Sequence, residues 1–246
     1  MSSDDPPIRL QACLNGDHDT GVHPMLPTST RELASDAAAC AAAGADSFHV
    51  HPRDASGRPT LDPEAVDAAV QAIRAATGKP VGVSTSQTIE RDPARRAEQI
   101  GAWAEPDYAS VNLAEDDAAA VMELLLDRGI DVEAGLSSPE DAQALVDSGL
   151  ADRVTRVLVE PYDDDGPDAA FSSVGAIHDL LDTYGVGAPR LQHSDGEAAW
   201  PVLEDAVARG LATRIGLEDT QQLGNGRAAS SNADLVRAAA ARDAQR

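Results

Sequence analysis

The sequence predicts a single (β/α)8 TIM barrel domain over residues 1–246, and three observations lead to this prediction. The chain has 246 residues, close to the ~250 of a typical barrel of this kind. Short β-rich runs alternate with longer alanine-rich helical stretches, a pattern typical of βαβ units and a parallel sheet. Eight such units follow one another without a break in composition. Closure into a barrel is therefore favoured over the alternative, an open doubly wound sheet.

Each predicted strand is a short run rich in β-branched and apolar residues. In chain order the runs are residues 8–14, 46–51, 80–85, 108–113, 130–135, 156–160, 189–194 and 213–218. No glycine-rich GxGxxG turn follows any of them, so the sequence does not support a dinucleotide site.

The helical stretches between these runs carry helix start and stop signals in the expected places. Several starts combine an N-cap residue with a glutamate three residues on or with a following proline, and glycines follow some helix ends. The start signals are Ser29 with Glu32, Asp62–Pro63, Asp92–Pro93 and Ser138–Pro139, and the stop signals are Gly44 and Gly78.

The charge of the chain is strongly acidic. Forty-two Asp and Glu residues face 19 Lys and Arg residues, the net charge is −23, and Lys79 is the only lysine. Such a charge argues against a nucleic-acid partner, whose phosphates would be repelled. Because self-repulsion of this size destabilises a fold unless salt screens it, we hypothesise a halophilic protein that works in a high-salt cytoplasm.

The chain shows no feature of a membrane or secreted protein. It has no apolar run near the ~18 residues that a membrane span needs, and its acidic start lacks the features of a signal peptide. Cys13 and Cys40 lie in apolar patterns and are expected to be buried. We therefore expect a cytoplasmic protein without a membrane partner.

Two histidines and a carboxylate at strand ends predict a metal site. Active sites of TIM barrels lie at the carboxyl ends of the strands. His49 and His51 end the second run two residues apart, so both imidazoles share one strand face, and Glu218 ends the eighth run. Strands 8 and 2 both flank strand 1 in a closed barrel. Two imidazoles and a carboxylate are the three protein ligands of a catalytic zinc site, although non-haem iron uses the same set.

Other strand ends place polar side chains at the same mouth. These are Asn15, Ser84, Ser86, Ser110, Asn112, Glu133, Glu160, His193 and Asp195. Arg214 lies four residues before Glu218 on the same strand face, and it is as consistent with a structural role as with a catalytic one. Asp219 follows Glu218 on the strand and is predicted to point away from the metal. His178 falls within a helix and is expected at the surface.

Several segments resemble the β-keto acid cleavage enzymes. They are LNGD and HPMLP, then AAGADSFHVHPRDASGRPTLD, and finally TRIGLEDT with a downstream SSNADLV. The resemblance covers nearly the whole chain. It implies a TIM barrel, a homotetramer, and a zinc ion bound by His49, His51 and Glu218. It also implies condensation of a β-keto acid with acetyl-CoA to give acetoacetate and a new CoA thioester.

The resemblance implies roles for further residues. Asp219 would be the base or hydrogen-bond partner that starts the reaction, Arg214 would orient it, and Ser84 and Ser110 would contact the keto acid. We predict Asp219, Arg214 and Ser84 as catalytic residues. Together with Ser110, the predicted substrate-binding residues are Asn15, Asn112 and Glu133.

The chain departs from the family pattern in two places. Many members carry a Glu after the first strand, where this chain reads Gly16–Asp17–His18–Asp19, and an STGG segment where it reads Ser84–Thr85–Ser86–Gln87. These departures keep open a metal-dependent lyase or aldolase that does not use CoA. A further alternative is a catalytically inactive barrel that holds its metal for structure and acts as a binding protein. An open coordination position favours catalysis, because structural zinc sites are usually closed by four protein ligands.

Overall fold

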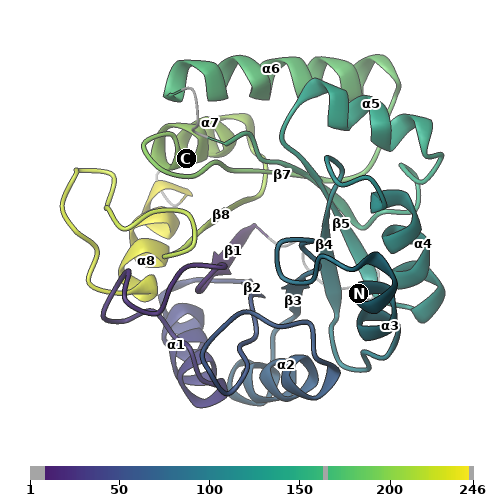
Figure 1. The fold of residues 1–246 in the computed structure, drawn as a ribbon. Helices are drawn as coiled ribbons and strands as arrows, with labels where there is room; N and C mark the ends of the chain where they lie inside the picture. Colours follow the sequence, from purple (N-terminus) through teal and green to yellow (C-terminus); the bar gives the residue numbers. More distant parts are fainter. Residues whose placement is uncertain (1–8, 163–165, 244–246) are drawn as a thin grey trace.

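The structure is a computed structural model, and it describes residues 9–162 and 166–243. Eight strands form one parallel sheet in the order β7-β6-β5-β4-β3-β2-β1-β8. A parallel bridge between Leu191 and Ala212 joins the two ends of this order, and Thr213 Oγ1 donates to Gln192 O across the same seam at 2.8 Å. Figure 1 shows the helices as an outer ring around the strands. The predicted TIM barrel is confirmed.

The strands and helices alternate along the chain. The strands are β1 (Leu10–Cys13), β2 (Ser47–Val50), β3 (Val81–Ser84), β4 (Tyr108–Asn112), β5 (Asp131–Leu136), β6 (Arg156–Val159), β7 (Arg190–Gln192) and β8 (Thr213–Ile215). The helices are α1 (Thr30–Ala43), α2 (Pro63–Thr77), α3 (Pro93–Gly101), α4 (Ala118–Arg128), α5 (Pro139–Asp147), α6 (Pro167–Thr183), α7 (Ala199–Arg209) and α8 (Asn232–Asp243).

The predicted start signals cap the helices. Ser29 and Glu32 form a reciprocal capping box at α1, and Ser138 does the same with Asp141 at α5. The Asp62 carboxylate accepts hydrogen bonds from two backbone N–H groups at the start of α2. Each cap satisfies backbone donors that have no partner within the helix. The boundaries of these helices are thus encoded locally.

The barrel interior contains a polar network beside the apolar core. Glu133 on β5 is 1% exposed; it accepts from Arg156 Nε at 2.6 Å and from Gln11 Nε2 at 3.2 Å. Gln11 Nε2 also donates to Tyr108 Oη at 3.0 Å. The Tyr108 ring lies over Gly82, where a Cβ would come within 1.8 Å of it. This network fills the barrel below the functional mouth.

Two predicted positions differ in the structure. Glu133 was predicted to bind substrate, but the network just described uses its carboxylate, since Arg156 lies beside it on β6. His178 was expected at the surface but is 5% exposed, and its Nε2 lies 2.8 Å from Oε1 of Gln192 on β7.

Among the helices of the described residues, none has both the length and the apolar character that a membrane span requires.

Candidate metal centre and its cavity

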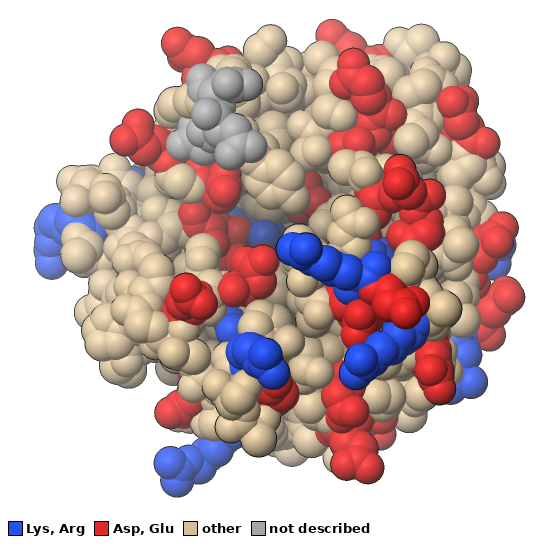
Figure 2. Space-filling view, viewed as in Figure 1, with Lys and Arg blue, Asp and Glu red and all other residues tan. Residues whose placement is uncertain are grey.

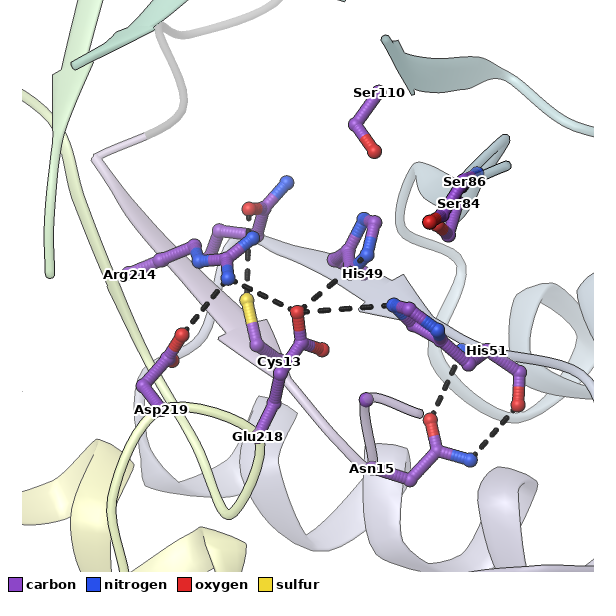
Figure 3. A network of polar contacts seen from close by, with 12 residues as sticks. Cys13, Asn15, His49, His51, Ser84, Ser86, Ser110, Arg214, Glu218 and Asp219 are labelled. Atoms are coloured by element: carbon purple, nitrogen blue, oxygen red, sulfur yellow. Dashed lines mark hydrogen bonds and ion pairs between the residues drawn. The ribbon is translucent and has the colours of Figure 1, made fainter. Parts of the chain in front are cut away.

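His49, His51 and Glu218 come together at the carboxyl ends of β2 and β8. Their ligand atoms all lie within 4.8 Å of one another, and they are the one group of this kind that could hold a metal ion among the described residues. His49 Nε2 and His51 Nε2 lie 3.7 Å and 3.8 Å from Glu218 Oε1. Figure 3 shows both imidazoles turned toward the Glu218 carboxylate. This grouping was predicted from the positions of the three residues at strand ends.

These residues fit a divalent metal ion. The His–Glu distances are too long for hydrogen bonds. They instead approach the separation of about 3.4 Å expected for two ligand atoms at zinc bonding distance in a tetrahedron. Buried atoms of the three side chains also lack hydrogen-bond partners: His49 Nδ1, His51 Nδ1 and Glu218 Oε2. A buried carboxylate oxygen without a donor is costly, and a cation would relieve that cost.

The electrostatics of the group suit metal binding. Burial lowers the pKa of His49 to about 3 and also lowers the pKa of His51, so both imidazoles are neutral near pH 7. Burial alone would raise the pKa of Glu218, but positive charge around it, above all Arg214, brings it to about 2. Neutral imidazoles and an ionised carboxylate are the forms that coordinate metals.

The backbone around the group is held by two buried asparagines. Asn15 Oδ1 accepts from His51 N at 2.9 Å, and Asn15 Nδ2 donates to His51 O at 2.9 Å. Asn232 Oδ1 accepts from Leu217 N at 2.6 Å, and its Nδ2 donates to Leu14 O at 2.8 Å. These four hydrogen bonds tie the ends of β2 and β8 to the end of β1, and so they set the positions of His51 and Glu218.

The role of Asn15 therefore differs from the prediction. We expected it to bind substrate, but it is fully buried and its amide is engaged by backbone groups. Asn232 was not assigned any role from the sequence. Its segment SSNADLV stands out only through the family resemblance. No local sequence pattern predicts that the Asn232 amide joins the backbone of Leu217 to that of Leu14.

Two glycines allow close approach at the same place. A Cβ on Gly216 would lie 1.7 Å from Cys13 O, so the end of β8 packs directly against the backbone of β1. Gly16 has φ +54°, and a Cβ there would lie 2.8 Å from Glu218 Cγ. Both positions require glycine to leave room for the Glu218 loop.

Glu218 and Asp219 lie in a turn, not on the strand as predicted. β8 ends at Ile215, and the N–H groups of Asp219 and Thr220 both donate to Gly216 O at 3.0 Å. The turn places the carboxylates of Glu218 and Asp219 within hydrogen-bond distance of the same guanidinium group, that of Arg214. Arg214 Nη2 donates to Glu218 Oε1 at 2.9 Å and to Asp219 Oδ1 at 2.8 Å. Asp219 is nevertheless not part of the metal group, in agreement with the prediction that the two acids do not both point at the metal.

Asp219 has the environment of an acid–base group. It is 5% exposed, and its Oδ2 has no hydrogen-bond partner. Burial raises the pKa of Asp219 to about 7, against the opposing effect of Arg214. A carboxyl group with a pKa near the working pH can both take up and release a proton.

A cavity of about 300 Å³ opens in front of the metal group. The predicted residues that line it are His49, His51, Ser84, Ser110, Asn112, Arg214, Glu218 and Asp219. Further residues expected at the mouth line it as well: Ser86, Glu160, His193 and Asp195. His193 is not part of the metal group, and its Nε2 lies 2.9 Å from Glu160 Oε2. The three-residue group therefore faces the cavity without a fourth ligand from the described residues.

Two larger cavities adjoin the first. One of about 710 Å³ shares His18, Glu218 and Asp219 with it. The other, of about 490 Å³, shares Asp17 and Thr88. Figure 2 shows acidic side chains around the hollow at the centre of this face, with basic side chains reaching over its edge. A small ligand at the metal group would thus have space on either side for a second, larger one.

Comparisons with known proteins agree with this architecture. A family model described as beta-keto acid cleavage enzyme matches residues 7–245. The comparison with curated proteins finds no match. Two solved structures of 11% and 12% sequence identity are similar in fold, and at such identities they show the fold alone. They are a type I 3-dehydroquinate dehydratase from Clostridium difficile (TM-score 0.65, 11% identity, 98% of this chain and 95% of that chain) and an N-acetylmannosamine-6-phosphate 2-epimerase from Clostridium perfringens (TM-score 0.58, 12% identity, 86% and 87%).

Proposed function

The chain belongs to the β-keto acid cleavage enzyme family, and we propose that it is a zinc-dependent enzyme that condenses a β-keto acid with acetyl-CoA. The products would be acetoacetate and a new CoA thioester. In the net reaction, the carboxymethyl unit of the keto acid leaves its acyl group and joins the acetyl group. The CoA sulfur leaves the acetyl group and takes up the acyl group, so all atoms balance without an oxidant or reductant.

The observation that carries this proposal is the open metal group. Three protein ligands face a cavity of about 300 Å³, and no fourth ligand comes from the described residues. This is the arrangement of catalytic rather than structural zinc sites. Zinc bound there would supply Lewis-acid stabilisation of negative charge on the keto oxygen as the carbon–carbon bond is remade.

Asp219 and Arg214 are proposed to handle the proton and its position. The raised pKa of Asp219, about 7, allows it to remove a proton from the carbon next to the keto group. Arg214 Nη2 donates a hydrogen bond to Asp219 Oδ1 and so keeps this carboxyl group beside the cavity. Arg214 is buried, at 7% exposure, which fixes its orientation.

The opposite wall of the cavity supplies neutral hydrogen-bonding groups for the keto acid. Ser84 and Ser110 occur side by side in the register of β3 and β4, and both line the cavity. Figure 3 places them across from the metal group. Their hydroxyl groups can donate to the carboxylate of the keto acid without adding charge.

A direct assay tests this function. Zinc-loaded protein in molar salt should form acetoacetate from acetyl-CoA and at least one member of a panel of β-keto acids. Formation that depends on both substrates supports the proposal. Cleavage without acetyl-CoA would replace it with the lyase or aldolase alternative, and bound zinc with no turnover on the panel would favour the inactive metal-holding barrel.

The family resemblance supports a tetrameric assembly, and the lack of membrane-span and signal-peptide features in the sequence supports a cytoplasmic location. We propose a homotetramer in the cytoplasm, with a β-keto acid and acetyl-CoA as its small-molecule partners. Light scattering on the eluate of a sizing column in molar salt tests the tetramer, because a monomer of 25.5 kDa would be clearly separated from it.

A further inference from the structure

The loop after β1 contacts Glu218 at two points. Gly16 packs against the side chain of Glu218, and a Cβ at this glycine would come within 2.8 Å of Glu218 Cγ. His18 Nε2 lies 2.9 Å from Glu218 O, and it donates the hydrogen bond because a carbonyl oxygen can only accept. Residues 16–18 therefore fix both the side chain and the backbone of this member of the metal group.

The segment after β2 is a short hairpin that carries Arg53. Arg53 and Pro59 form an antiparallel bridge, and Asp54 N donates to Arg58 O at 2.8 Å. The Asp54 carboxylate also accepts from Arg58 N at 3.1 Å. Because the hairpin begins two residues after His51, its position is tied to that of the two histidines of the metal group.

The Arg53 side chain joins this hairpin to the loop after β1. Its Nη2 donates to Gly16 O at 2.6 Å, and its Nη1 donates to Gly57 O, within the hairpin, at 3.3 Å. Gly57 itself packs against Thr20, since a Cβ there would come within 3.2 Å of Thr20 Cγ2. Backbone carbonyl groups of two loops thus share one guanidinium group, and a lysine ammonium does not reproduce its fixed fork of donors.

We propose that Arg53 is a positioning residue of the metal site. By holding Gly16 O, it keeps the loop after β1 against Glu218. The Glu218 carboxylate then stays at the distance from the two histidines that a shared metal ion requires. Arg53 is not among the residues that line the cavity of about 300 Å³, so it acts through this loop and not on the substrate. The inference rests on the metal group of the proposed function.

The charge of Arg53 and its hydrogen bonds have opposite effects on metal binding. A positive charge two residues from His51 repels a divalent cation, so loss of the charge alone would strengthen zinc binding. Loss of the hydrogen bond to Gly16 O would weaken zinc binding, by about 10–100-fold as for other groups that support a metal ligand. The direction of the change therefore separates the two effects, and molar salt reduces the effect of the charge by screening it.

The test measures the zinc affinity of the full chain in molar salt by competition with a chelator. Arg53→Met removes the charge and the donors and should bind zinc about 10–100-fold more weakly than the wild type. Arg53→Lys keeps the charge but not the paired donors, so its loss of affinity should be intermediate. Arg58→Met is the matched control, because the Arg58 side chain is 80% exposed and bonds to Asp54 and Ser56 of its own hairpin. Its zinc affinity should equal that of the wild type.

Two further measurements separate positioning from a purely structural role. The visible spectrum of bound cobalt reports the geometry of the metal ligands, and denaturant unfolding of the metal-free protein reports the stability of the fold. Arg53→Met should change the cobalt spectrum because Glu218 shifts, whereas Arg58→Met should not. If Arg53→Met does not fold, Arg53→Lys decides the question. A lower stability with an unchanged cobalt spectrum and unchanged zinc affinity would limit Arg53 to the fold and overturn the inference.

Other results would also decide against it. Tighter zinc binding by Arg53→Met, or zinc affinities of both Arg53 variants equal to that of the wild type, would overturn the inference. A wild type that binds no zinc would overturn it together with the proposed function. Acetoacetate formation is measured separately. Arg53-dependent zinc binding without acetoacetate would reject the CoA-dependent function alone, and acetoacetate formation with unchanged zinc affinity in the variants would reject this inference alone.

Discussion

The side-chain amide of Asn15 exchanges two hydrogen bonds with the backbone of His51, one from His51 N to Oδ1 and one from Nδ2 to His51 O, both 2.9 Å long. Asn15 follows β1, so this exchange continues the β1–β2 pairing beyond the last strand residues. It holds His51, which lies outside the regular ladder, at a fixed distance from the neighbouring elements. The metal group is therefore pre-organised by the backbone and not only by its three side chains.

Asp219→Asn is expected to keep the metal and lose turnover. The change retains the size of the side chain and leaves the three ligands in place, but it removes the group with a pKa of about 7. The rate should fall by about 10²–10⁴-fold, the range for loss of a general acid or base. Metal content and acetoacetate formation are measured on the same sample. A variant that binds no zinc would show that Asp219 belongs to the ligand set.

Asn232→Ala is expected to weaken both the fold and the metal site. It removes the hydrogen bonds to Leu217 N and Leu14 O and leaves buried backbone groups without partners, so unfolding should become easier by about 2–4 kcal/mol. Metal affinity should fall by about 10–100-fold, as for other supports of a metal ligand. Denaturant unfolding of metal-free protein and chelator competition measure the two effects.

Asn225→Ala is the matched control for this brace. Asn225 lies in an exposed loop, where its Oδ1 accepts only from Arg227 N at 3.1 Å. It should change neither quantity appreciably. A loss of stability in Asn232→Ala with unchanged metal affinity, and an unchanged visible spectrum of bound cobalt, would limit Asn232 to a structural role.

The pH dependence of stability is expected to include a contribution from Asp36. Burial raises its pKa from 3.8 to about 6, although Asn232 opposes the shift by donating to it. The folded state then holds a proton that the unfolded chain has released, so this contribution to stability falls as pH rises from about 4 to about 6. The difference between the two pKa values corresponds to about 3 kcal/mol.

Asp36→Asn removes this contribution. The variant should be more stable than the wild type at pH 7, and the gap should close as pH falls below 4. Denaturant unfolding at several pH values measures it, with the exposed Asp152→Asn as the control for charge. A gap that does not depend on pH would show that Asp36 titrates alike in the folded and unfolded states.

Salt is expected to stabilise the fold strongly. The net charge of −23 creates repulsion that mobile ions screen, since the Debye length falls from ~10 Å at 0.1 M to ~3 Å at 1 M. Thermal unfolding in low and in molar KCl should therefore give a clearly higher midpoint in molar KCl. Equal midpoints would contradict the halophilic hypothesis.

The strands and several helix starts could be predicted because their signals are local. Apolar periodicity marked all eight strands, and N-cap residues marked helix starts such as Ser29 and Asp62. The eighth strand was predicted three residues too long, to Glu218 instead of Ile215. Its apolar pattern continues through Leu217, whereas the structure shows a turn there, with the N–H groups of Asp219 and Thr220 donating to Gly216 O.

The metal group was predictable, but several side-chain partners were not. Topology alone places the ends of β2 and β8 on either side of β1. The partners of Asn15 and Glu133, by contrast, are 36 and 23 residues away, and Asn232 meets Leu14 across 218 residues. Whether a buried polar group faces a cavity or another side chain depends on such contacts, which a sequence pattern does not specify. The sequence pattern therefore did not show that the side chains of Asn15 and Glu133 are engaged by such partners.

Metal content of the wild type and of Glu218→Gln tests the central claim most directly. Both proteins are stripped with chelator, dialysed against a small excess of zinc in molar salt, and analysed for bound metal. We expect about one zinc ion per wild-type chain and almost none in Glu218→Gln, which loses the charged ligand of the group. A wild type without metal, or a Glu218→Gln variant that binds as much zinc as the wild type, would contradict the account.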